Sequence, residues 1–193
     1  MNQRLLDSNA YFRLAKSFHP LLGGPYGKDE LVLKVLVDVD TEFSKNPRLD
    51  SKFSWVSEAE FTANRKKNLF SASGDKVDDI HHASIFIRDW VKEQRSKFQS
   101  QRLTPPSPVD CAVLAHGYVM GFAIVSDDAG MAYTAREFEI CFIGGHELLK
   151  ELLDMEIITI QKIQSAMEYL SWLDDLPPRW RREAKALFGL SLP

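Results

Sequence analysis

The chain opens with a short apolar segment, a polar turn and a longer segment whose apolar residues are spaced as in a helix. The first segment is Gln3–Leu6, and the turn is Asp7-Ser8-Asn9. Apolar residues then recur with a helical period as far as Ala15. This pattern predicts a strand followed directly by a helix, with Ser8 and Asn9 as the residues that cap the helix start.

The next part of the chain is predicted to hold one strand and then mostly polar helices. Leu31–Val37 is apolar and rich in β-branched residues, which favours a strand, and the spacing from Val39 onward predicts a helix ending near Pro47. The boundary between the two stays open, because short apolar runs do not decide it. Residues from about 57 to 104 are mostly polar at helical spacing. They begin with the capping-box sequence Ser57-Glu58-Ala59-Glu60.

The second half of the chain alternates predicted helices with short apolar strands. Val109–Met120 reads as a helix closed by Gly121, and Phe122–Val125 and Phe138–Ile143 read as strands. Further helices are predicted at 132–136, 146–153, 159–170 and 179–188. Alternating helices and strands indicate an α/β fold with a mostly parallel sheet. We expect one domain over 1–193, with a polar helical insertion at about 57–104 and a helical tail at about 159–193.

Composition narrows the function classes only slightly. The 193 residues are 45% hydrophobic and 26% charged, as in ordinary globular domains, and the net charge is −3. A protein that coats nucleic acid by bulk positive charge is therefore disfavoured. An enzyme that contacts nucleic acid at an acidic, metal-loaded site is not.

Two cysteines, Cys111 and Cys141, fit neither a disulfide framework nor a zinc pattern. We expect both to be buried and reduced, as in cytosolic proteins. The first residues contain no apolar stretch followed by a small-residue cleavage site, so a cytoplasmic location and no membrane association are expected.

Acidic residues follow two of the predicted strands and open one helix. Asp7 ends the first strand, Asp127 and Asp128 follow Phe122–Val125, and Asp110 begins the helix before that strand. Because ligands of open α/β sheets bind at the carboxyl ends of the strands, these acids are expected at one edge. Gathered carboxylates repel one another, and a divalent cation relieves the repulsion. All-oxygen ligands suit Mg²⁺ or Mn²⁺.

The order of these motifs resembles that of the PIN-domain family of ribonucleases. The motifs are Leu5-Leu6-Asp7-Ser8-Asn9-Ala10, then Pro108-Val109-Asp110-Cys111-Ala112-Val113-Leu114-Ala115, then Ala123-Ile124-Val125-Ser126-Asp127-Asp128. The turn Gly144-Gly145 and the following Glu147-Leu148-Leu149 are also similar to the family. The resemblance implies a three-layer α/β/α fold. The polar segment at 57–104 is longer than a compact member needs.

Carried over residue by residue, the resemblance implies a site of four acidic catalytic residues that bind the metal. These are Asp7, Glu42, Asp110 and Asp128. It places Asn9, Ser126 and Asp127 around them as orienting residues. Glu42 is the choice for the second acid, with Asp38 and Asp40 as competitors nearby on the same predicted helix.

The resemblance also implies a function. It points to an endoribonuclease that hydrolyses RNA phosphodiester bonds with Mg²⁺ or Mn²⁺, the toxin of a toxin–antitoxin pair. The expected partners are RNA, a small antitoxin protein and a second copy of the chain in a homodimer. The alternative is an inactive PIN-like interaction module. A phosphatase with a strand-end Asp nucleophile is disfavoured because Asn9 stands where a second Asp is usual. A dinucleotide-binding enzyme lacks its glycine fingerprint.

Several features also have purely structural interpretations. The segment Asp7-Ser8-Asn9 and Asp110 can serve only as helix caps, and Asp127-Asp128 only as a solvated turn. The basic groups Arg65-Lys66-Lys67 and 88–102 are more typical of a solvated helix face than of an RNA contact. We expect the pair His81-His82 at the surface. Three aromatic residues near the C-terminus are expected in the core or against a partner: Trp172, Trp180 and Phe188.

Overall fold

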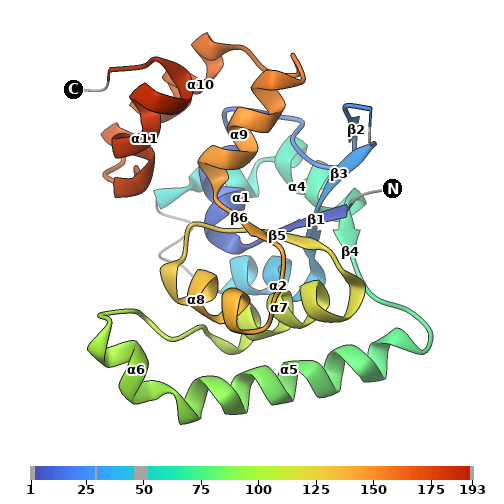
Figure 1. Cartoon of the computed structure of the whole chain (residues 1–193). Coiled ribbons are helices and arrows are strands. Elements are labelled where there is room, and N and C mark those ends of the chain that lie inside the picture. Colours follow the sequence, from blue (N-terminus) through green and yellow to red (C-terminus); the bar gives the residue numbers. More distant parts are fainter. Residues whose placement is uncertain (1–2, 29, 46–51, 192–193) are drawn as a thin grey trace.

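The computed structural model describes residues 3–28, 30–45 and 52–191, and a six-stranded sheet lies at its centre (Figure 1). The strand order is β2-β3-β1-β5-β6, and β4 also pairs with β3. Every pairing is parallel except that of β2 with β3, which confirms the predicted α/β fold with a mostly parallel sheet. The strands are β1 (Gln3–Leu6), β2 (Pro25–Tyr26), β3 (Leu31–Leu36), β4 (Leu69–Phe70), β5 (Ala123–Val125) and β6 (Phe142–Ile143).

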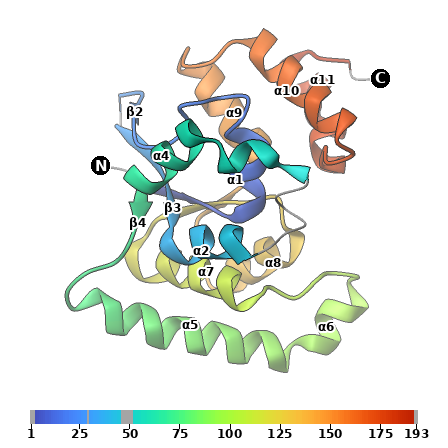
Figure 2. The ribbon, with the colours of Figure 1, turned by 180° about the vertical axis from the view of Figure 1, so that it is seen from behind.

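Helices cover both sides of the sheet (Figures 1 and 2). One side carries α1 (Ser8–Leu14), α4 (Ala59–Lys67) and α9 (Gly145–Asp154), with the 3₁₀ turn η1 (Ser54–Ser57) beside them. The other side carries α2 (Val37–Lys45), α7 (Pro108–Met120) and α8 (Ala129–Glu137). Further helices pack outside these: α5 (Lys76–Glu93) and α6 (Arg95–Ser100) below, and α10 (Ile160–Trp172) and α11 (Pro178–Phe188) above.

The central strands are buried on both faces, which explains their continuous apolar sequences. In β3 only Lys34 is partly exposed, and Leu5 and Leu6 of β1 are fully buried. Strands covered by helices on both faces need apolar side chains at successive positions rather than at alternate ones. The register pairs Leu6 with both Val35 and Val125. The carboxyl ends of the three neighbouring strands therefore lie level, and the residues that follow them meet at one edge.

The structure corrects two of the predicted helix starts. The N-cap of α1 is Asp7, not Ser8 or Asn9, because the backbone is still extended at Asp7 and helical from Ser8 onward. The capping box predicted at Ser57 is also wrong. Residues 54–57 form η1, so α4 begins only at Ala59, after Glu58, whose side chain makes no capping hydrogen bond.

The polar segment at 57–104 is not helical throughout, because it contributes strand β4 to the sheet. Val35 and Leu36 of β3 pair with Leu69 and Phe70 of β4, which the sequence pattern did not predict. A strand of two residues leaves no period to detect. The helical spacing predicted for this segment is borne out over α5. The predicted helix end at Pro47 lies outside the described residues, within which α2 extends to Lys45.

The predicted strand Phe138–Ile143 is wrong over most of its length. Helix α8 continues to Glu137, and Glu139 has a φ of 55° that ends any extended run. Only Phe142–Ile143 pairs in the sheet, at its edge. Cys141 precedes this edge strand and is exposed, so the expectation that both cysteines are buried holds only for Cys111.

The tail beyond residue 159 divides its aromatic residues between core and surface. Trp180 and Phe188 are buried as expected, whereas Trp172 is 80% exposed, so the core alternative is wrong for it and contact with a partner stays a prediction. Trp172 is the last residue of α10, and its ring stacks on that of Tyr169. The apolar spacing alone did not reveal on which side of the helix its indole lies.

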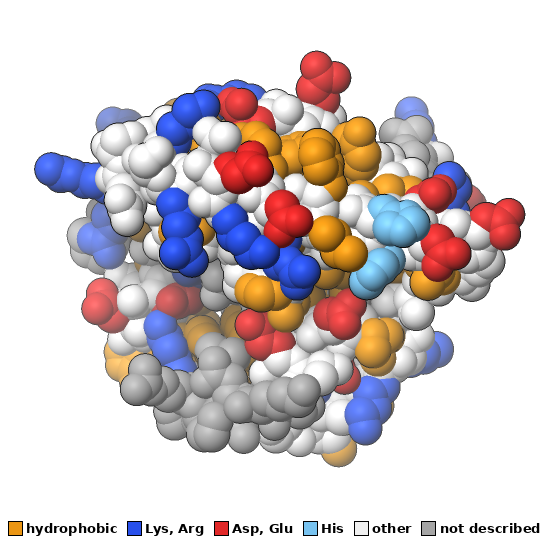
Figure 3. All heavy atoms as spheres, turned by 90° about the horizontal axis from the view of Figure 1, so that it is seen from below, with side chains coloured by type: hydrophobic (Ala, Val, Ile, Leu, Met, Phe, Trp, Pro, Cys, Tyr) orange, Lys and Arg blue, Asp and Glu red, His pale blue; other side chains and the backbone are white. Residues whose placement is uncertain are grey.

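The outer face that carries α5 mixes exposed apolar and charged side chains (Figure 3). Hydrophobic side chains gather there between basic side chains on one side and histidines on the other. The exposed rings include Phe86 and Tyr118, and His81 and His82 lie at the surface as predicted. The solvated-face interpretation fails for Arg65, which is buried against Asp40.

The described residues include no helix with both the length and the apolar character that crossing a bilayer requires.

Candidate functional site

The candidate site lies where the strand order of the sheet reverses. From β1 the chain continues to β3 on one side, whereas β5 lies on the other side of β1. In open α/β sheets such a reversal leaves a crevice at the carboxyl ends of the two strands. Asp7 directly follows β1, and Ser126, Asp127 and Asp128 directly follow β5. The backbone bond from Asp7 N–H to the carbonyl of Val125 holds the two strand ends together.

Asp7 combines helix capping with an unusual protonation equilibrium. Its Oδ1 accepts a hydrogen bond of 2.6 Å from the Ala10 N–H, and its Oδ2 accepts one from the Ser126 hydroxyl. Only 2% of Asp7 is exposed. Burial raises the pKa of Asp7 to about 7, against the lowering effect of those two hydrogen bonds, and the charges of Asp110 and Asp127 raise it further.

Asp110 is the acid that joins the cluster from α7. The sequence predicts Asp110 both as a cap of the helix and as a site residue. The cap is present: Asp110 Oδ2 accepts a hydrogen bond from the Ser107 N–H at 2.8 Å, and the Asp110 N–H donates to the Ser107 hydroxyl. Burial raises the pKa of Asp110, hydrogen bonding to Ser107 opposes this, and the charges of Asp128 and Glu42 raise the pKa further. Asp110 thus interacts with each of the three other predicted acids.

Helix α2 presents three acids, and they face different surroundings. Glu42 accepts a 2.7 Å hydrogen bond from the Ser8 hydroxyl, and its charge raises the pKa of Asp110. Asp40 forms an ion pair with Arg65. Asp38 is exposed, and its charge favours the protonated form of His116 instead. Of the three candidates for the second acid, Glu42 is the one whose charge the structure brings near Asp110.

Ser126 is buried between two of the acids. Its hydroxyl donates to Asp7 Oδ2 and accepts from the Asp128 N–H at 3.0 Å, so it fixes both residues relative to each other. Asp128 is the N-cap of α8, with Oδ1 accepting from the Met131 N–H at 2.7 Å. Asn9 is exposed on α1 and hydrogen bonds through its side chain to none of the described residues.

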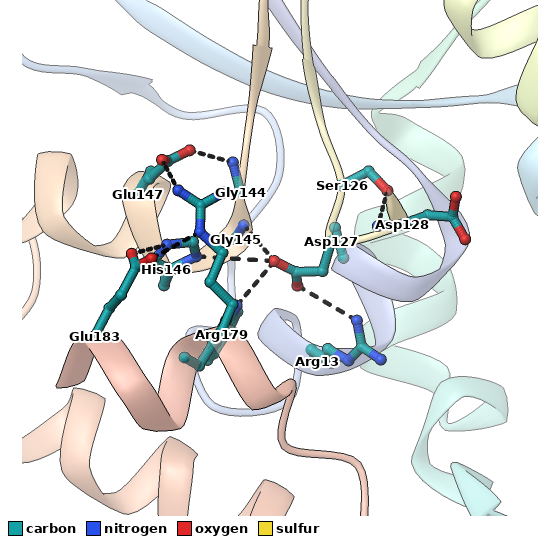
Figure 4. A network of polar contacts seen from close by, with 12 residues as sticks. Arg13, Ser126, Asp127, Asp128, Gly144, Gly145, His146, Glu147, Arg179 and Glu183 are labelled. Carbon is teal, nitrogen blue, oxygen red and sulfur yellow. Dashed lines mark hydrogen bonds and ion pairs between the residues drawn. The ribbon is translucent and has the colours of Figure 1, made fainter. Parts of the chain in front are cut away.

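Asp127 and Asp128 point to opposite sides of the chain (Figure 4). The Asp127 carboxylate turns toward α9 and α11, where its Oδ1 accepts from Gly145 N–H at 3.0 Å and from the Trp180 indole at 2.8 Å. Its Oδ2 lies 3.3 Å from the Arg13 guanidinium. Burial on its own raises the pKa of Asp127, but the neighbouring His146 ring and these three partners together lower it below its ordinary value.

This second network was not predicted from the sequence. His146 is fully buried and bonds to Glu183 through Nε2 at 2.7 Å, while Arg179 pairs with Glu183 and Glu147 at 2.9 Å each (Figure 4). These residues belong to α9 and α11, far from Asp127 in the chain. No spacing rule connects them, because the contact depends on how the tail folds back over the sheet.

The donor chemistry of the acidic cluster fits a hard divalent cation. Asp7, Glu42, Asp110 and Asp128 offer only carboxylate oxygens, the ligands that Mg²⁺ and Mn²⁺ prefer. Glu42, Asp110 and Asp128 each use one oxygen in the hydrogen bonds above, and their second oxygens bond to no described residue. Within residues 3–28, 30–45 and 52–191, however, no three His, Cys, Asp or Glu side chains converge closely enough to hold a metal ion. To bind one metal ion, the side chains of these acids would have to rotate toward a common point.

Comparison of the chain with models of protein families and with curated proteins finds no match. The interpretation of the cluster therefore rests on its own geometry and on the resemblance of its motifs.

Close packing at Gly130 positions Asp128. A Cβ at Gly130 would lie 1.9 Å from the carbonyl oxygen of Thr104, so the loop before α7 passes directly against the first turn of α8. This contact holds the segment that carries the Ser107 cap beside the residue that follows β5.

We predict that Gly130→Ala destabilises the protein by about 1–3 kcal/mol, because backbone must move to admit the methyl group. The gain of about 1 kcal/mol in helix propensity does not offset this. Gly24→Ala is the control, since a Cβ there would meet only the Tyr26 ring at 3.9 Å. Urea unfolding checks the prediction, and equal midpoints for the two variants would contradict it.

Proposed function

We propose that this chain is a Mg²⁺- or Mn²⁺-dependent endoribonuclease with a PIN-like three-layer fold. The observation that carries the proposal is the position of Asp110. Its carboxylate repels those of Glu42 and Asp128 and raises the pKa of Asp7. Four acids from distant parts of the sequence thus form one cluster at the carboxyl edge of a parallel sheet, the place where such folds bind ligands.

In this proposal Asp7, Glu42, Asp110 and Asp128 hold the metal. A bound divalent ion supplies a more acidic water and neutralises charge on the phosphate under attack. The positive charge of a bound divalent ion would also favour the ionised form of Asp7, which burial disfavours.

Serine residues beside the cluster orient the carboxylates. Ser126 donates to Asp7, Ser8 donates to Glu42, and the Ser107 N–H donates to Asp110. In Glu42 and Asp110 the bond fixes one oxygen and leaves the other for a ligand, whereas both oxygens of Asp7 already accept hydrogen bonds. In this proposal Ser8 has the orienting role that the resemblance implies for Asn9, because the Ser8 hydroxyl bonds to Glu42 of α2 while Asn9 is exposed.

The biological role follows from the resemblance alone. It makes the chain the toxin of a toxin–antitoxin pair, with an antitoxin that blocks the acidic cluster and a homodimer as the assembled form. Inside the cell these partners belong to the cytoplasm. The alternative is a PIN-like interaction module without activity.

The experiment is cleavage of a total RNA pool by the purified protein with Mg²⁺, with Mn²⁺ and with EDTA. We expect cleavage only with a divalent ion. We expect Asp110→Asn to reduce the rate of cleavage on the order of a thousandfold, because the variant removes the carboxylate whose charge acts on each of the other three acids. Asp38→Asn is the matched control: it neutralises an exposed acid of α2 outside the cluster and should leave the rate within about twofold.

Two outcomes would reject the nuclease proposal. Cleavage that survives EDTA or Asp110→Asn would assign the activity to another site. Absence of cleavage together with absence of Mn²⁺ binding in a calorimetric titration would favour the inactive interaction module.

A further inference from the structure

A pocket of about 310 Å³ opens beside the acidic cluster, between the end of β5 and the start of α11. Ser126, Asp128 and Ala129 form one wall. The opposite wall belongs to the tail and consists of Pro177, Pro178, Arg179 and Arg182. Its size lies at the low end for ligand pockets, which suits one nucleotide unit of a flexible strand rather than a duplex.

The two arginines of the pocket differ in how their charges are balanced. They lie three residues apart on α11 and therefore face the same side of the helix. Arg179 is paired with Glu147 and Glu183, and these two carboxylates account for its charge (Figure 4). Arg182 is exposed and forms neither an ion pair nor a hydrogen bond with any residue that the structure describes. The pocket thus has an uncompensated guanidinium across from Asp128.

This arrangement favours a phosphate over other ligands. A guanidinium offers parallel N–H donors that match two phosphate oxygens. An anion near Asp128 alone would be repelled, so a cation on the opposite wall is needed to hold it there. Phe142 and the two prolines add an apolar surface that suits the sugar or base attached to that phosphate.

We propose that this pocket binds the phosphate of the nucleotide next to the scissile bond, with Arg182 as the residue that contacts it. This proposal deepens the proposed nuclease function and rests on it, because the position of the phosphate is defined by the bond that is cut. It assigns the C-terminal helix α11 a part in substrate binding, where the net charge of −3 gives the chain no general attraction for RNA. Arg179, held by Glu147 and Glu183, is the positioning residue that keeps this wall of the pocket in place.

The test is binding of a fluorescein-labelled single-stranded RNA oligonucleotide, measured by anisotropy in EDTA at several salt concentrations. Arg182→Ala should weaken binding about tenfold and lower the slope of log K against log salt by about one, as expected for the loss of one phosphate contact. Arg181→Ala is the matched control. It removes the same charge from the neighbouring position of α11, where the side chain hydrogen bonds to Ser171 and does not line the pocket. Its affinity should stay within about twofold.

Cleavage kinetics separate this proposal from the nuclease proposal. If RNA is cut and Asp110→Asn abolishes cutting, Arg182→Ala should raise KM with little change in kcat, since a contact with a phosphate that does not react is made equally in ground and transition states. Equal behaviour of the Arg182 and Arg181 variants in affinity, salt slope and KM would overturn the phosphate site and leave the nuclease standing. Arg182-dependent binding without any cleavage would support the phosphate site and reject the nuclease.

Discussion

Replacing Asp7 with Asn is expected to stabilise the metal-free protein at neutral pH while it abolishes RNA cleavage. The Asp7 carboxyl is buried, and its pKa is raised to about 7 from an ordinary value of 3.8. An unfolded chain therefore loses this proton near pH 4, whereas the folded chain keeps it until about pH 7. Between these values the folded state binds more protons, and stability falls as the pH rises, by about 1.4 kcal/mol per pH unit.

Asn imitates the protonated form of Asp7. Its carbonyl oxygen can accept from the Ala10 N–H, and its amide can donate to the Ser126 hydroxyl, but it has no proton to lose. We therefore expect the variant and the wild type to have similar free energies of unfolding at pH 4. At pH 7.5 the variant should be more stable by a few kcal/mol. Urea unfolding in EDTA at both pH values measures the difference.

Metal provides a second, independent readout for Asp7. If the cluster binds Mn²⁺, the ion should stabilise the wild type at pH 7.5 in proportion to its affinity and should stabilise Asp7→Asn much less. A pH-independent difference between the two proteins in EDTA would show that Asp7 does not titrate in this range. Equal stabilisation of both by Mn²⁺ would show that Asp7 is not a ligand.

The second large effect is expected at Trp180. Its side chain is fully buried, packs against Gly145 and donates to Asp127. Trp180→Ala should cost about 3–5 kcal/mol, because it leaves a cavity and removes a hydrogen bond from a buried carboxylate. Trp172→Ala is the control from the same tail: this side chain is 80% exposed, so a change within about 0.5 kcal/mol is expected.

Thermal and urea unfolding of both tryptophan variants check this prediction. If Trp180→Ala lost as little free energy of unfolding as Trp172→Ala, α11 would contribute little to the stability of the rest of the chain. A large loss for Trp180→Ala combined with the same slope of free energy against urea would show that the tail unfolds together with the sheet rather than before it.

The sequence predicted best those features that depend on local pattern. Strand β1 and helix α7, with Gly121 at a φ of 69° after its last residue, follow from apolar spacing and from the need for glycine in the left-handed region. Strand β4 was missed because its place is decided by pairing with β3, far away in the chain. Such pairings leave no trace in a window of a few residues.

The same distinction applies to the candidate site. Asp7, Asp110 and Asp128 were recognisable because each stands at a strand end or helix start, and such positions have local signals. The choice of Glu42 over Asp38 and Asp40 depended on the direction of three side chains on α2, which only tertiary packing settles. The partners of Asp127 and the exposed Arg182 lie on helices whose placement over the sheet no short motif encodes.

The opposite orientation of Asp127 and Asp128 makes the length of the segment after β5 as informative as its composition. Successive side chains at the end of a strand point to opposite sides. If the segment after β5 moved on by one position, Asp127 would stand where Asp128 now faces the acidic cluster, and Ser126 would stand where Asp127 now bonds to Arg13 and Trp180. A single inserted glycine before Ser126 would leave the composition of acids unchanged, yet it would remove the carboxylate that anchors α11 and would put Asp128 at the first position of α8. Two identical neighbouring residues are thus distinguished by count alone.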